Sequence, residues 1–303
     1  MGRNEYRHHG AQADGGAHPA RRSDHSRSVS PRAPPPERDD VAFDATYVPA
    51  GQEALVGGDW YDAFSLPDGR IVLSIGDVAG HGLSAAVDAG RLRQVIFSEA
   101  LDSTDPAGVL AKADKVLRAQ GDTIATALVA FYNPVDATVT HASAGHPMPI
   151  VSTATGVTRL LSGVGAPLGT GFIDGALSVP TNVVALEDDS LLVLYTDGIT
   201  EFRRDPLGGE ARLLEVVARL ADRSTERPAS TLLQDIAGDL APSDDIAILV
   251  MRRSTEVGKL QPKAAHVTKT WRFHSSHAYS ARASRLELVA CLRDHARRPK
   301  TSS

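Results

Sequence analysis

Alternation of apolar and polar side chains predicts a series of β-strands that starts at Val41. Residues 61–66 and 70–75 read as two such strands, and Pro67-Asp68-Gly69 between them is a turn sequence typical of a hairpin. The second strand has an apolar face formed by every second residue, namely Ile71, Leu73 and Ile75.

After Gly82 the period becomes helical, with an apolar face at Leu92, Val95 and Ile96 and with charged residues outside it at Arg91, Arg93 and Glu99. A second helix has a clear start, because Asp105 can cap it and Pro106 suits its first turn. We expect further strands at 125–132, 137–143, 191–196 and 246–251, and helices at 213–221 and 232–240. Strand pairs, then helices, then strands predict an α+β fold with antiparallel sheets, not a doubly wound parallel sheet.

The chain divides by composition into four parts. Residues 1–40 are rich in Gly, Pro, Ser and Arg without a helix or strand period, which predicts a disordered N-terminal tail. Residues 41–253 carry the periodic pattern of a folded domain. We expect a linker at 254–268 and a separate basic segment at 269–303. His8 and His9 can bind metal in principle, but their place in the tail argues against a built site.

Charge is distributed unevenly along the 303 residues, whose net charge is −5. Residues 41–258 carry a net charge of −14 and residues 259–303 one of +8. The acidic middle disfavours nucleic-acid binding and can concentrate divalent cations, although solubility alone also explains it.

One cysteine, Cys291, excludes an internal disulfide framework. Without a membrane-length apolar run or a secretory leader, we expect a cytoplasmic protein.

Acidic residues stand where predicted strands start or stop, and glycines flank several of them. They are Asp59, Asp77, Asp197, and the pair Asp244 and Asp245. Clustered carboxylates repel one another and are costly to bury, and few basic residues lie near them in the sequence. Two divalent cations, Mn²⁺ or Mg²⁺, would resolve both problems, and such pairs activate water against phosphorus. Each acid can also be a plain turn residue or helix cap.

Six motifs in order over residues 41–253 resemble the SpoIIE/RsbU-like phosphatases, a family of the PPM superfamily of metal-dependent Ser/Thr protein phosphatases. They are Val56-Gly57-Gly58-Asp59-Trp60-Tyr61-Asp62, Ile75-Gly76-Asp77-Val78-Ala79-Gly80-His81-Gly82, Ala125-Thr126-Ala127-Leu128, Ala144-Gly145-His146-Pro147, Tyr195-Thr196-Asp197-Gly198-Ile199-Thr200-Glu201 and Asp244-Asp245-Ile246. The resemblance implies two packed antiparallel sheets flanked by helices, a four-layer αββα sandwich, with two Mn²⁺ or Mg²⁺ ions at one edge.

The resemblance also implies roles for individual residues. Asp77 would bridge both metal ions, and the Val78 carbonyl would add a ligand. Asp197 and Asp244 would hold one ion and Asp59 would serve the other, with Asp245 as the alternative to Asp244. His81 would be either a general acid or a loop residue that shapes its turn, and His146 a structural residue of a Gly-His-Pro turn.

The implied activity is removal of phosphate from phosphoserine or phosphothreonine on a protein. The family implies an anti-anti-sigma factor as substrate, in a partner-switching pathway that controls a stress sigma factor. The helices after Gly82 resemble the family's regulatory switch region, so control by a regulator or by a homodimer is a further expectation.

The basic segment 269–303 resembles the start of the histidine-kinase-like ATPase domains of anti-sigma kinases and stops before any ATP-binding motif, so we expect no kinase activity. A basic helix at an anionic surface or a disordered tail are the alternatives. Two other functions compete for the acidic region: a non-catalytic phosphatase-fold binding module, and a metal-dependent nuclease or small-phosphoester hydrolase.

Overall fold

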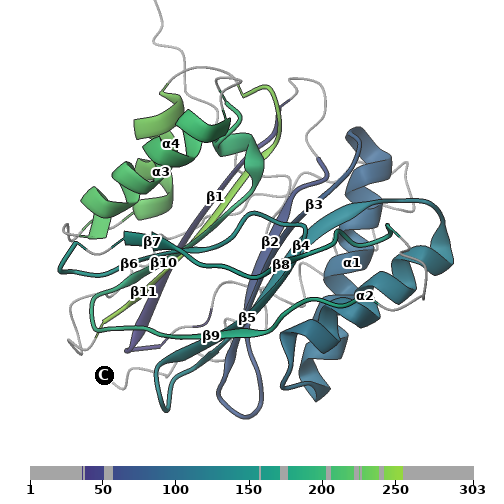
Figure 1. Ribbon diagram of the computed structural model, residues 1–303, viewed down its shortest axis with the longest axis horizontal. Helices are drawn as coiled ribbons and strands as arrows, with labels where there is room; N and C mark the ends of the chain where they lie inside the picture. Colours follow the sequence, from purple (N-terminus) through teal and green to yellow (C-terminus); the bar gives the residue numbers. More distant parts are fainter. Residues whose placement is uncertain are drawn as a thin grey trace, which may run out of the picture. The chain divides into compact units, whose positions relative to one another are not determined.

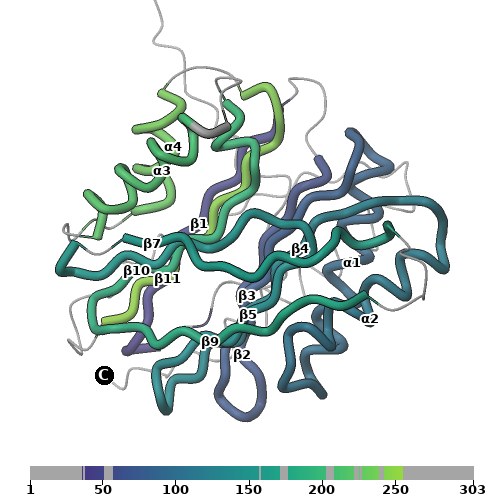
Figure 2. Tube along the Cα trace, in the orientation of Figure 1, coloured from purple at the N-terminus to yellow at the C-terminus, as the bar shows by residue number. Residues whose placement is uncertain are grey.

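The computed structural model of the chain describes residues 36, 38–50, 57–156, 158–170, 177–202, 206–221, 225, 227–238 and 242–254. Most of the predicted tail at 1–40 lies outside these residues, as do the expected linker after residue 254 and the ATPase-like segment at 269–303. Figure 2 traces the chain through the described elements. Within them, no helix combines the length and the apolar character that crossing a bilayer requires.

The described residues form two sheets that pack face to face. The first has the order β1 (Val41–Val48), β11 (Ile246–Arg253), β10 (Leu191–Tyr195), β6 (Ile150–Ser152) and β7 (Thr158–Leu160). The second has the order β2 (Trp60–Ser65), β3 (Ile71–Val78), β4 (Ala125–Asn133), β5 (Thr138–Ala144) and β8 (Val164–Gly165), and β9 (Asn182–Ala185) also pairs with β5. Among the pairs of these described strands, the short β5–β8 pair alone is parallel.

Helices cover the outer face of each sheet (Figure 1). Helices α1 (Gly82–Asp102) and α2 (Pro106–Gln120) pack on the second sheet, and α3 (Pro206–Ala221) and α4 (Pro228–Ala237) pack on the first. The predicted α+β fold with two antiparallel sheets flanked by helices is therefore confirmed.

Three apolar cores separate the four layers, and strand alternation explains them. Ile71, Leu73 and Ile75 of β3 lie in the core between the sheets, as predicted, while Val72 points toward α1 and α2. Trp60, which is fully buried, belongs to the helix-side core. A strand with both faces buried has little freedom to slip, because a shift of one residue would exchange its two faces.

Several element boundaries follow from the predicted caps and others do not. The Asp105 carboxylate accepts hydrogen bonds from the backbone N–H groups of Ala107 and Gly108, both at 3.1 Å, so α2 starts as predicted. Helix α4 ends at Ala237, before the expected residue 240, and Gly238 follows it with a φ of 63°. Helix α3 begins at Pro206, earlier than the expected residue 213.

One charged side chain of α1 is less exposed than its polar character suggests. Arg93, expected outside the apolar face of the helix, is largely buried and donates to both carboxylate oxygens of Asp62, at 2.9 and 3.0 Å. Helical periodicity separates polar from apolar residues, but it cannot predict that a buried carboxylate on β2, that of Asp62, lies next to this arginine. The ion pair fastens α1 to the strand that follows Asp59.

Candidate metal centre

The β2–β3 hairpin brings two of the predicted aspartates together. Trp60 pairs with Gly76, so Asp59, one residue before β2, lies opposite Asp77 near the end of β3. The two carboxyl groups are close enough to share a hydrogen bond. The backbone agrees with this placement, because Val78 donates its N–H to the Gly58 carbonyl at 3.3 Å.

The first sheet brings its aspartates to the ends of β10 and β11. Asp197 opens the short 3₁₀ helix η1 (Asp197–Ile199), two residues beyond the end of β10. Asp244 and Asp245 directly precede β11, which pairs antiparallel with β10. A side chain on Gly198 would lie 2.1 Å from the Asp245 carbonyl oxygen, so the turn after Asp197 packs directly on the Asp244-Asp245 segment.

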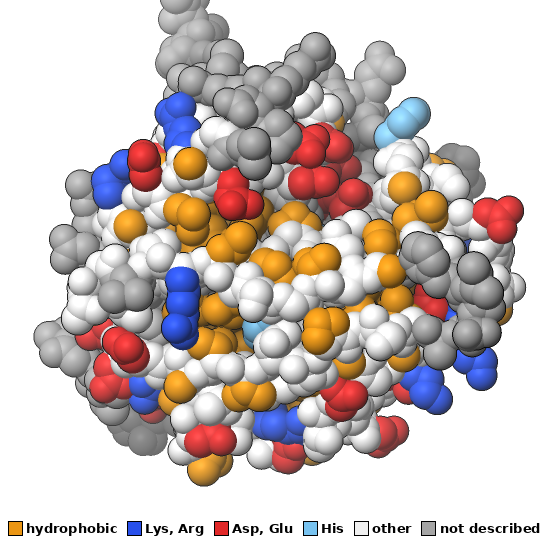
Figure 3. All heavy atoms as spheres, in the orientation of Figure 1, with side chains coloured by type: hydrophobic (Ala, Val, Ile, Leu, Met, Phe, Trp, Pro, Cys, Tyr) orange, Lys and Arg blue, Asp and Glu red, His pale blue; other side chains and the backbone are white. Residues whose placement is uncertain are grey.

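The charges of the aspartates on the first sheet affect the pKa of Asp77 on the second sheet. The pKa of Asp77 is raised to about 6, mainly by burial; a hydrogen bond with Asp59 lowers it, and the charges of Asp197, Asp244 and Asp245 raise it. Burial and the charge of Asp77 raise the pKa of Asp59 well above its usual range. Figure 3 shows acidic side chains gathered on the surface at one end of the molecule's folded part.

Asp197 shows the same pattern on the other sheet. Its pKa is raised by burial first, then by the charges of Glu201 and Asp244. The main influences on Asp59, Asp77 and Asp197 include no lysine or arginine. Within the described part of the chain, none of these carboxylates has the cationic partner that would offset the loss of solvation on burial.

The donor groups of this site suit hard divalent cations. Asp59 Oδ2 is buried without a hydrogen-bond partner, and the Thr196 hydroxyl bonds to the same carboxyl group. A Cβ atom on Gly58 would lie 2.5 Å from the Val78 carbonyl oxygen and 3.1 Å from Asp77 Oδ1. Residue 58 can therefore approach these oxygens so closely only because it has no side chain, and oxygen ligands are those that Mg²⁺ and Mn²⁺ prefer.

The aspartates influence one another electrostatically but do not form a complete set of metal ligands among the described residues. Among the described residues, no three His, Cys, Asp or Glu side chains already meet in the arrangement of a metal-binding cluster. Repulsion between unneutralised carboxylates acts against such an arrangement.

The Asp244-Asp245 pair divides into two different environments. Asp245 accepts hydrogen bonds from Ala50 N–H at 2.9 Å through Oδ1 and from Gly58 N–H at 3.1 Å through Oδ2. It therefore ties the segment after β1 and the segment before β2 to the start of β11. The Asp244 side chain is exposed, and the one hydrogen bond that it accepts from the described residues is local, from Asp245 N–H at 2.8 Å.

The two histidines of the motifs differ in environment. His81 is exposed and precedes α1, and its side chain accepts no capping hydrogen bond from the helix; within the described residues no interaction links it to the aspartates. His146 is buried and bonds to Thr126 Oγ1 at 2.8 Å and to the Tyr195 carbonyl oxygen at 3.1 Å. Sequence analysis did not identify Thr126 and Thr196 as parts of the site, although both lie inside the quoted motifs.

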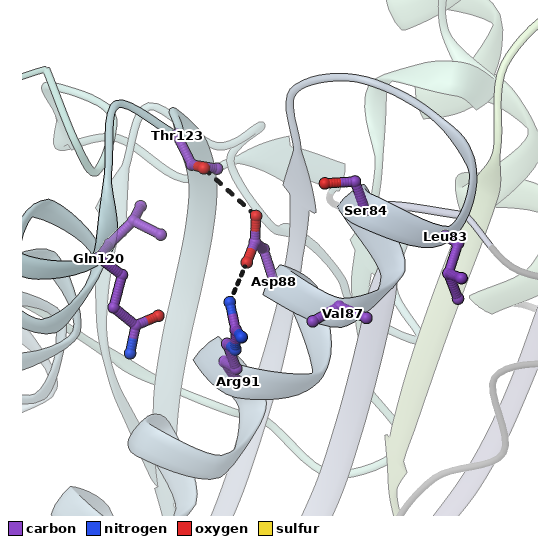
Figure 4. Close-up of a pocket in the computed structure, with 8 residues that line it drawn as sticks. Leu83, Ser84, Val87, Asp88, Arg91, Gln120 and Thr123 are labelled. Carbon is purple, nitrogen blue, oxygen red and sulfur yellow. Dashed lines mark hydrogen bonds and ion pairs between the residues drawn. The ribbon is translucent and has the colours of Figure 1, made fainter.

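A separate hollow of about 460 Å³ lies between the first turns of α1 and the end of α2 (Figure 4). The Asp88 carboxylate lies in it and accepts hydrogen bonds from Arg91 at 2.9 Å and from Thr123 at 3.3 Å. None of the aspartates of the site lines this hollow. The candidate metal centre, at the strand ends that carry the aspartates, is thus separate from the hollow between α1 and α2.

Comparison with known proteins shows which proteins this chain is similar to. The chain is 27% identical over 169 residues to the phosphoserine phosphatase RsbP of Bacillus subtilis, covering 54% of this chain and 40% of that protein. It is 25% identical over 253 residues to protein IcfG of Synechocystis, covering 72% of this chain and 39% of that protein. The chain therefore spans about two fifths of the length of these curated relatives.

Among solved structures, the RsbU and RsbW domains of Rv1364c from Mycobacterium tuberculosis are similar, with a TM-score of 0.64 and 27% identity over 84% of this chain and 69% of that one. The family model described as "Stage II sporulation protein E (SpoIIE)" matches residues 67–254, which include every aspartate of the site except Asp59. The chain belongs to the SpoIIE family.

Proposed function

We propose that this chain is a metal-dependent phosphoprotein phosphatase that hydrolyses phosphoserine or phosphothreonine with the help of two divalent cations, Mn²⁺ or Mg²⁺. The observation that carries the proposal is the mutual influence of carboxylates from both sheets, the buried Asp59 and the half-buried Asp77 and Asp197, which have raised pKa values and form no ion pair with a lysine or arginine among the described residues. Similarity to a protein named phosphoserine phosphatase supports the reaction class.

The proposed ligands are those that the family resemblance implies. Asp77, whose pKa is affected by carboxylates of both sheets, would contact both cations, and the Val78 carbonyl would add a ligand. Asp59 would serve one cation, and Asp197 and Asp244 the other. Asp245 is the poorer candidate of its pair, because backbone N–H groups already occupy both of its carboxylate oxygens.

Bound cations would supply Lewis acidity that activates water and neutralises phosphoryl charge. The protein's own contribution is to orient the carboxylate ligands and to exclude water around them. Thr196 is fully buried, accepts a hydrogen bond from Ala247 N–H at 2.8 Å and bonds to the Asp59 carboxyl group, which fixes that carboxylate relative to the first sheet. Asp245 fixes the backbone at Gly58, next to Asp59. Such fixed orientation is what phosphoryl transfer demands of a protein.

We propose an anti-anti-sigma factor as the phosphoprotein substrate, on the basis of the family resemblance. The main competitor is a phosphatase-fold module that binds regulators without catalysis. A chain that had lost catalysis would have no need to keep uncompensated buried carboxylates, which cost stability.

The test is release of phosphate from a phosphoserine protein and from a chromogenic phosphate ester, with Mn²⁺ or Mg²⁺ added. We expect wild type to be active and Asp77→Asn and Asp197→Asn to lose activity by about 100-fold or more. Asp136→Asn is the matched control, because Asp136 is an exposed turn residue between β4 and β5.

Two results would reject the proposal. Wild type that stays inert with every divalent metal while binding a partner protein tightly would favour the binding module. Equal activity of wild type, Asp77→Asn and Asp197→Asn would show that the aspartates are not the site.

A further inference from the structure

His146 is a buried polar residue whose backbone is fixed from both sides. It follows β5, and Ser143 Oγ both donates to the His146 carbonyl at 2.7 Å and accepts from the His146 N–H at 3.2 Å. Gly145 before it has a φ of 68°, and a side chain there would lie 2.5 Å from the ring of Pro167. The imidazole therefore enters the space between the sheets along one defined direction.

The ring bonds to both sheets at once. Its Nε2 lies 3.1 Å from the Tyr195 carbonyl oxygen on β10, and its Nδ1 lies 2.8 Å from Thr126 Oγ1 on β4. A carbonyl can only accept, so Nε2 carries the proton, and Nδ1 of the neutral ring accepts from the Thr126 hydroxyl. Burial lowers the pKa of His146 to about 3, which keeps the ring in this neutral form.

Both anchors of the ring lie next to proposed ligands. Thr126 is the residue directly opposite Asp77 in the β3–β4 pair, so the two side chains project from the same face of the sheet. Tyr195 is the last residue of β10, two residues before Asp197. His146 is thus a bridge between the strand pair that carries Asp77 and the strand that leads to Asp197.

The bridge matters for cation binding because ligand geometry is strict. Ligand–metal distances have a tolerance of about 0.2 Å, so the spacing between the sheets must be held closely where Asp77 and Asp197 face each other. Neighbouring sheets pack about 10 Å apart through side chains that can adjust. A ring held by two directed hydrogen bonds adjusts less.

We propose that His146 is a positioning residue of the cation centre, whose neutral imidazole sets the separation between Asp77 and Asp197 by linking Thr126 to the Tyr195 carbonyl. This inference rests on the proposed function. It differs from a merely structural role, which would lower stability and leave the affinity for cations unchanged.

The test is the dissociation constant of Mn²⁺ by titration calorimetry, together with the melting temperature of each metal-free variant. His146→Gln keeps a donor near Nε2 and lacks an acceptor at Nδ1, and Thr126→Val removes the same bond from the other side. We expect each to weaken Mn²⁺ binding about tenfold or more. Thr126→Ser keeps the hydroxyl and should bind like wild type.

His141→Gln is the matched control, because His141 is a buried histidine too; it lies on β5 opposite Ala130, which pairs with Leu73. That register places it about four residues, roughly 13 Å, further into the sandwich than Asp77. It should lower the melting temperature and leave Mn²⁺ affinity unchanged. Combining His146→Gln with Thr126→Val should weaken binding no more than either alone, because both remove one bond.

The outcomes separate this inference from the function on which it rests. If wild type binds no divalent cation, the proposed function fails and the inference fails with it. If wild type and Asp136→Asn bind Mn²⁺ but Thr126→Val and His146→Gln bind equally well, only the positioning role is rejected. Should His146→Gln fail to fold, the contrast between Thr126→Val and Thr126→Ser decides the question.

Discussion

Replacing Gly58 with alanine would insert a methyl group between the proposed ligands. Its Cβ would lie 2.5 Å from the Val78 carbonyl oxygen and 3.1 Å from Asp77 Oδ1, whereas ordinary contacts begin at 3.4 Å. The carbonyl and residue 58 would have to separate by about 0.9 Å, several times the tolerance of about 0.2 Å for ligand–metal distances. The Val78 carbonyl belongs to the backbone of a buried strand, so it cannot simply rotate away.

The expected cost of Gly58→Ala has two parts. Overpacking at a tight site typically destabilises by about 1–3 kcal/mol, which a denaturant titration of the metal-free protein would measure. Displacement of the Val78 carbonyl should also raise the dissociation constant for Mn²⁺ by about tenfold or more, measured by calorimetry.

Gly90→Ala makes the same chemical change with the opposite expectation. Gly90 lies in α1 with nothing within 4 Å of its Cβ position. Alanine there should stabilise the protein by about 0.5–1 kcal/mol, since glycine is the poorer helix former. If Gly58→Ala matched wild type in both stability and Mn²⁺ affinity, the carbonyl of Val78 would not be held as a ligand in the way described.

Three other predictions concern charge and capping. Asp77→Asn should stabilise the metal-free protein by about 1–3 kcal/mol at pH 7.5. The pKa of Asp77 is raised in the folded state, so ionisation of this carboxyl group makes the folded protein less stable as the pH rises from 3.8 to about 6, and asparagine avoids that loss. Melting curves should show that the gain in stability becomes smaller below pH 6. Asp62→Leu should cost about 3 kcal/mol in a denaturant titration by leaving the buried Arg93 without its carboxylate, and a combined Asp62→Leu, Arg93→Met variant should recover much of it. Asp105→Ala should cost about 1 kcal/mol through loss of the α2 cap, with no change in Mn²⁺ affinity.

Local signals were sufficient for most elements of the fold. The hairpin at Pro67-Asp68-Gly69, the cap at Asp105 and the alternating face of Ile71, Leu73 and Ile75 each depend on neighbouring residues, and each was predicted correctly. The order of the strands in each sheet could not be predicted from the sequence, because the pairing of β1 with β11 joins residues about two hundred positions apart. No local pattern specifies such a contact.

The site shows the same division. Glycines beside Asp59 and Asp197 signalled close backbone approach, and Gly58 and Gly198 do lie against the Val78 and Asp245 carbonyl oxygens. The distinct environments of Asp244 and Asp245 could not be read from two adjacent identical residues. They depend on Ala50 and Gly58, whose N–H groups reach Asp245 from distant segments. The burial of Arg93 and the two-sheet contacts of His146 are of this long-range kind as well.

The most direct test of the central claim is a crystal structure of the protein with Mn²⁺, in which anomalous scattering locates the ions. We expect two manganese peaks about 3.5–4 Å apart, with a carboxylate oxygen of Asp77 between them and Asp59, Asp197 and Asp244 around them. A fully occupied manganese site elsewhere, with no peak beside Asp77, would contradict it.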